Sequence, residues 1–63
     1  MSEAVAFIRL TLNSGGESIV INTAHITGMI SRQGYSRVDI VGGEYYWVKE
    51  SLDVILQRIE LCT

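Results

Sequence analysis

Residues 37–59 have the sequence RVDIVGGEYYWVKESLDVILQRI, which contains the two periodicities that decide the fold. Val38 and Ile40 alternate with polar residues, and the glycines at 42–43 suit the tight turn of a β-hairpin. From Leu52 onward the apolar residues fall at helical spacing instead. The elements predicted from this stretch are strands over about 37–41 and 44–48 and an amphipathic helix over about 51–61.

The β pattern also extends through the first half of the chain. Apolar residues alternate along 4–12, residues 13–16 include two glycines that suit a hairpin turn, and β-branched residues follow at 17–22. A further β-prone stretch covers 25–31, where Gly28 indicates a bulge. We therefore expect an α+β fold, with a small, half-barrel-like antiparallel sheet of four to five strands and one C-terminal helix packed on one face.

The predicted core consists of the apolar positions that face inward in these elements. They are Ile8, Leu10, Leu12, Ile19, Ile21, Ile26, Ile30, Val38, Ile40, Val48, Leu52, Ile55, Leu56 and Ile59. The chain has no proline, linker or repeat, so we expect a single domain over residues 1–63.

The composition is that of a globular protein with few means of extra stabilisation. Hydrophobic residues make up 48% of the 63 residues and charged residues 19%, which disfavours both a disordered segment and a membrane span. Cys62 is the only cysteine and His25 the only histidine, which rules out an intramolecular disulfide and the usual four-ligand zinc site. Because so small a domain buries only about 60% of its unfolded surface, we expect a homo-oligomer.

The distribution of charged residues disfavours nucleic acid as a partner, and it also disfavours a secreted protein. The net charge is −2, and the basic residues are scattered along the chain with acidic residues between them, whereas phosphate binding needs clustered bases. Residues 1–10 have no basic segment before their apolar run, which ends at Arg9. We therefore expect no signal peptide and a cytoplasmic protein.

No group of residues in the sequence indicates catalysis. His25 has no acidic partner at strand or helix spacing, and no serine lies in the elbow motif of hydrolases. Glu50 and Asp53 lie where a helix begins, a position at which acidic side chains stabilise the helix dipole. We therefore expect no enzyme activity, no metal site and no cofactor.

The aromatic run at residues 45–47 is the most informative local feature. Because a strand alternates its faces, Tyr45, Tyr46 and Trp47 cannot all lie in one core. Tyr45 and Trp47 are predicted to share the face away from the helix, where they would meet solvent, another protein or a second copy of the chain. Tyrosine, tryptophan and arginine are enriched in interfaces, which favours self-association or partner binding over simple exposure as the hypothesis to test.

A polar loop expected over 31–36 supplies a second candidate surface, formed by Arg32, Tyr35 and Arg37. With Lys49, these residues favour an alternative function, that of a nucleic-acid-binding regulator of transcription or of messenger RNA. A further alternative is a small ligand bound between subunits, as in a phage or plasmid accessory protein.

The order of short motifs along the chain matches a known family. The motifs are Ile8-x-Leu10, Asn13-x-Gly15-Gly16-Glu17, Ile19-x-Ile21-Asn22, His25-Ile26, Val38-x-Ile40, Gly43-x-Tyr45 and Val48-Lys49-Glu50-Ser51, followed by the helix. In these motifs, over residues 7–61, the chain resembles the FlbD-type family of small flagellar and swarming-motility proteins. The resemblance implies a non-enzymatic accessory protein of motility. The chain departs from the family pattern at 31–36 and at Tyr46-Trp47.

Two further resemblances cover less of the chain. Residues 18–59 are similar to the C-terminal half of LytTR-type DNA-binding domains, with Ile21-Asn22-x-x-His25-Ile26 as the shared motif. The length and the final helix are similar to the carbon-storage regulator class of RNA-binding proteins. Both imply nucleic-acid binding.

Overall fold

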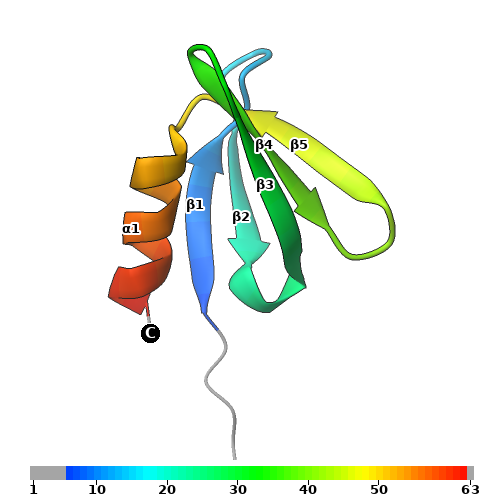
Figure 1. The fold of residues 1–63 in the computed structure, drawn as a ribbon, viewed down its shortest axis with the longest axis vertical. Coiled ribbons are helices and arrows are strands. Elements are labelled where there is room, and N and C mark those ends of the chain that lie inside the picture. The colour runs from blue at the N-terminus through cyan, green and yellow to red at the C-terminus, as the bar shows by residue number, and fades with distance from the viewer. Residues whose placement is uncertain (1–5, 63) are drawn as a thin grey trace, which may run out of the picture.

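The computed structural model of the chain describes residues 6–62 and has the predicted α+β class (Figure 1). Its elements in chain order are β1 (Phe7–Thr11), β2 (Ser18–Asn22), the short 3-10 helix η1 (Thr23–His25), β3 (Ile26–Arg32), β4 (Tyr35–Ile40), β5 (Glu44–Val48) and α1 (Leu52–Cys62). Residues 4 and 5, the start of the first predicted strand, lie outside the described residues.

The strands form two antiparallel sheets rather than one. β1 pairs with β2, and β3, β4 and β5 form a meander in that order. The two sheets meet at one bridge, between Leu12 and Val48. Beside this bridge Asn13 N donates to Trp47 O over 2.9 Å, and Lys49 N donates to Thr11 O over 2.8 Å. Beyond it β5 runs away from β1 toward the β4–β5 turn, so the two strands pair only at their ends (Figure 1).

The polar stretch at 31–36 is part of a hairpin, and the expectation of a loop there is wrong. Arg32, the last residue of β3, pairs with Tyr35, the first of β4. Only Gln33 and Gly34 remain for the turn, and Gly34 takes a positive φ of 87° that favours glycine. The prediction was wrong because polar residues also occur at the ends of strands, where the side chains are exposed to solvent.

A bulge in β3 changes which side chains face the core. Ile26 pairs with Ile40 but Gly28 pairs with Asp39, so one extra residue lies in β3 between these pairs. An extra residue reverses the alternation of the strand beyond it. Ile30 consequently pairs with Arg37 on the face away from the core, and the prediction of Ile30 as a core residue is wrong.

The core lies between the two sheets and α1. Its buried residues are Ile8, Leu10, Ile21, Val38, Val48 and Ile55, all of which were predicted, and the half-buried residues packed against it are Ile19, Ile26, Met29, Ile40, Tyr46, Leu52 and Ile59. Leu12 is half-buried. Leu56 is 48% exposed, so its predicted place in the core is wrong. The helix contacts β1 and β3 through a narrow stripe, and Leu56 lies beside that stripe.

The difference between neighbouring helix positions can be tested directly. Replacing Ile55, which is fully buried, with alanine should lower the free energy of unfolding by about 2–5 kcal/mol. The matched change Leu56→Ala should lower it by about 0.5 kcal/mol or less. Urea unfolding followed by circular dichroism measures both, and similar losses for the two variants would contradict this description of the helix face.

Candidate interaction surface

The face of the β3–β4–β5 sheet opposite the core carries the candidate site, and we call it the outer face. Because Val38 and Val48 are buried on the inner face, alternation directs the residues beside them outward. β4 supplies Arg37 and β5 supplies Trp47, and these two residues are directly paired across the strands. The outer face carries Tyr35, Arg37 and Asp39 from β4, Tyr45 and Trp47 from β5, and Gly28, Ile30 and Arg32 from β3.

Trp47 lies at the centre of an aromatic cluster on this face. Its ring centroid is 5.4 Å from that of Tyr35 and 5.9 Å from that of Tyr45, and both pairs are edge-to-face. Such contacts stabilise ring pairs beyond the apolar area that they bury. The three rings therefore hold one another in place on the sheet surface.

The guanidinium group of Arg37 contacts two rings of the cluster. Its guanidinium carbon lies 5.3 Å from the centroid of the Tyr45 ring and 5.7 Å from that of Trp47, within the range of cation–π attraction. Arg37 Nε also lies 3.1 Å from Asp39 Oδ1, as an ion pair whose N–H is not aligned for a hydrogen bond. These contacts together restrict the position of the guanidinium on the outer face.

The two surfaces predicted from the sequence are one surface in the structure. Tyr35 and Arg37 lie beside Tyr45 and Trp47 because β4 and β5 are paired. Tyr45 remains 53% exposed, while Trp47 and Tyr35 are half-buried by their mutual packing.

Two further basic residues lie at the end of the outer face nearest the β3–β4 turn. Arg32 is exposed and pairs across the turn with Tyr35. Lys49 is also exposed and lies two residues past Trp47. Its ammonium reaches the β1–β2 turn, where a Cβ added to Gly16 would be 3.7 Å from Lys49 Nζ. Among the described residues neither Arg32 nor Lys49 forms an ion pair.

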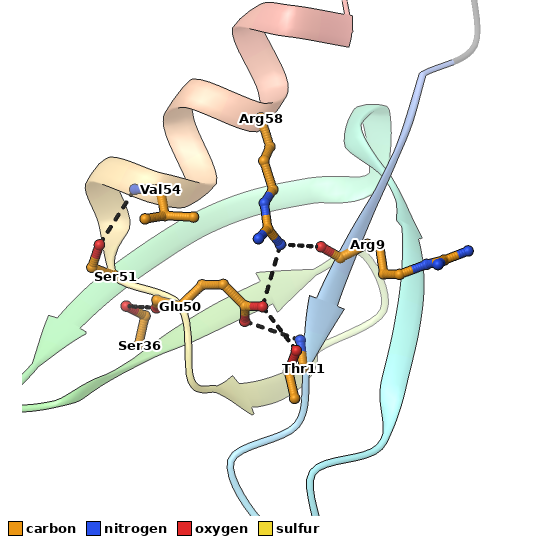
Figure 2. Close-up of polar contacts among 7 residues, drawn as sticks. All are labelled: Arg9, Thr11, Ser36, Glu50, Ser51, Val54 and Arg58. Carbon is orange, nitrogen blue, oxygen red and sulfur yellow. Dashed lines mark hydrogen bonds and ion pairs between the residues drawn. The ribbon is translucent and has the colours of Figure 1, made fainter.

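A separate polar network surrounds Glu50, between β5 and α1 (Figure 2). Glu50 Oε1 accepts from the backbone N–H of Thr11 over 2.9 Å, and Oε2 accepts from the Thr11 hydroxyl over 2.9 Å. Arg58 Nη1 donates to the same Oε2 over 3.2 Å and also to Arg9 O. The hydroxyl of Ser36, which is fully buried, donates to Glu50 O over 2.8 Å. The network therefore links β1, β4 and α1.

The environment of Glu50 favours its ionised form. Burial by itself raises the pKa of the carboxyl group, since only 11% of the side chain is exposed. Hydrogen bonds from the backbone and hydroxyl of Thr11 and from its own backbone N–H, together with the charge of Arg58, outweigh that effect and lower the pKa below its ordinary value of 4.5. With every oxygen of the carboxylate engaged, the group serves as a structural anchor.

No pocket opens on the surface of residues 6–62, and no group of His, Cys, Asp or Glu side chains within that range could hold a metal ion. None of the helices in this range is long and apolar enough to cross a membrane. Comparison with protein-family models, with curated proteins and with solved structures finds no match to this chain. The FlbD-type resemblance stays a prediction.

The roles of two side chains in these networks were not predicted from the sequence. Asp39 orients Arg37, and the spacing of two residues on a strand is the signal that could have placed them on one face. Glu50 was expected only to favour the helix dipole, because nothing in the sequence pairs it with Thr11, which lies 39 residues earlier.

The anchor role of Glu50 predicts an acid-sensitive stability. Glu50→Gln leaves one acceptor oxygen in place of two and removes the charge opposite Arg58, so at pH 7 it should lower the free energy of unfolding by about 1.5–3 kcal/mol. Because folding lowers this pKa, the contribution of the carboxylate is fully present above about pH 4.5 and is lost as the pH falls through the folded-state pKa. The gap between the wild type and the variant should therefore shrink at pH 3.

Urea unfolding at a series of pH values measures this gap. Asp53→Asn is the matched control, since Asp53 is an exposed acid in the first turn of α1. A gap for Glu50→Gln that stays constant between pH 7 and pH 3 would contradict the anchor role.

Proposed function

We propose that the protein is a non-enzymatic interaction module that acts through its outer face, by binding a second copy of itself or another macromolecule. The observation that carries the proposal is the cluster of Trp47, Tyr45, Tyr35 and Arg37 on a face that the helix leaves uncovered. Aromatic residues and arginine dominate the energetic centres of protein interfaces.

The order within the cluster supports a binding role. Ring contacts and the ion pair of Arg37 with Asp39 already restrict these side chains. Side chains that already occupy a single rotamer before binding lose less conformational entropy when a partner binds. The absence of a pocket in residues 6–62 favours a macromolecular partner over a small substrate.

The size of the chain supports self-association as the first outcome to examine. A domain of 63 residues without a disulfide gains stability when apolar surface is covered by a second copy. The association with motility that the FlbD-type resemblance implies stays part of the proposal, as does a cytoplasmic location.

The proposal predicts that removing one exposed ring weakens self-association. If the partner is a second copy, the solution mass of the wild type should rise with concentration, and Tyr45→Ala should weaken the apparent dissociation constant by about tenfold, as for an interface residue worth more than 1 kcal/mol. Light scattering over a wide concentration range measures the mass. The emission of Trp47, the only tryptophan, reports on this face at the same time.

Phe7→Ala is the matched control, because Phe7 is a similarly exposed aromatic residue on the other sheet. Equal weakening by Phe7→Ala and Tyr45→Ala would place the contact elsewhere. A wild type that stays monomeric leaves a different macromolecule as the partner, and the proposed function then depends on finding a ligand whose binding needs Tyr45.

A further inference from the structure

We infer that the ligand of the outer face is single-stranded nucleic acid, with unpaired bases stacking on its aromatic rings and phosphates contacting its basic rim. The inference rests on the proposed function, since it names the partner of the same face. It also revises the expectation drawn from net charge, because the fold gathers residues that the sequence scatters.

The first observation is the separation of charge. The chain as a whole has a net charge of −2. On the outer face, however, Arg32 and Arg37 outnumber Asp39, and Lys49 follows at the end of β5. The exposed acids beside the face are Glu44, at the opposite end of β5, and Glu17, which follows Gly16 in the β1–β2 turn. Asp39 is held by Arg37, so Arg32 and Lys49 remain available to a negatively charged ligand. A local positive field on a negatively charged protein selects for an anionic partner.

The second observation is the position of the basic residues beside the rings. Arg32 pairs directly with Tyr35, so this exposed arginine lies next to one ring of the cluster. Lys49 follows the last residue of β5, and its ammonium extends to the β1–β2 turn at Gly16. A polyanion on the rings would therefore contact Arg32 directly and would reach Lys49 where it extends toward the β1–β2 turn.

The third observation is the combination of exposed rings with a surface that has no pocket. Base stacking needs only an exposed ring and is tolerant of sequence, because every base has a π face. Tyr45 is 53% exposed, Tyr35 and Trp47 are partly exposed, and no pocket opens among residues 6–62. Duplex nucleic acid keeps its bases stacked inside, so these rings favour a single strand.

The experiment is a titration of fluorescein-labelled oligothymidylate of about twelve nucleotides with the full chain, followed by fluorescence anisotropy at low salt. We expect saturable binding accompanied by quenching of Trp47 emission. For single strands log K falls with log salt by about 0.7 per phosphate contact, so two or three contacts predict a slope of about −1.4 to −2.

Variants assign the binding to the outer face. Arg32→Ala and Tyr45→Ala should each weaken binding by about fivefold or more, because stacking on one ring or the loss of one phosphate contact is worth at least that factor. Arg9→Ala is the matched control, since Arg9 is an exposed arginine on β1 and its loss changes the net charge equally. It should change binding by less than about twofold. Circular dichroism confirms that each variant is folded.

Three results would overturn the inference. They are no binding of oligothymidylate at low salt, equally tight binding of a duplex or of polyglutamate, and equal weakening by Arg9→Ala and Arg32→Ala. Self-association that requires Tyr45, without binding of the oligonucleotide, would refute this inference and leave the proposed function intact. If neither self-association nor any ligand depends on Tyr45, both proposals fail.

Discussion

The arrangement of the domain depends on the hydrogen bonds that the carboxylate of Glu50 accepts. Within residues 6–62, backbone pairing joins the two sheets only at the bridge between Leu12 and Val48. Glu50 reinforces that junction, because it accepts two hydrogen bonds from Thr11 on β1 and one from Arg58 on α1. Removing either the carboxylate or one of its donors leaves a buried polar group without a partner, which lowers the stability of the folded state. The helix is thereby kept against β1 and β3 and away from the outer face.

The outer face follows from the burial of the opposite face. Fully burying Val38 and Val48 leaves the neighbouring residues, Arg37 and Trp47, no position except outward. Since these two residues are directly paired, an arginine and a tryptophan must meet on the surface. The same alternation that stabilises the core therefore places the aromatic and arginine side chains of the proposed binding surface on the outer face, and no loop is needed to form it.

The sequence predicted the individual strands and the helix more accurately than the register and the contacts between them. The alternation of Val38 and Ile40 and the helical spacing from Leu52 onward placed the final hairpin and the helix correctly, because both periods are local. The bulge at Gly28 was also recognised, but its effect on Ile30 required the register, which depends on β4. In the same way, Tyr35 and Tyr45 looked like members of separate surfaces until the pairing of β4 with β5 brought both rings against Trp47.

The most direct test of the outer face as the working surface is a map of amide chemical shifts from ¹⁵N-labelled protein, recorded on dilution and on addition of oligothymidylate. We predict changes centred on Tyr35, Arg37, Tyr45 and Trp47, including the indole N–H of Trp47, with α1 and the β1–β2 sheet unaffected. Changes centred on α1 or on the β1–β2 sheet, or no change under either condition, would contradict a binding role for this face.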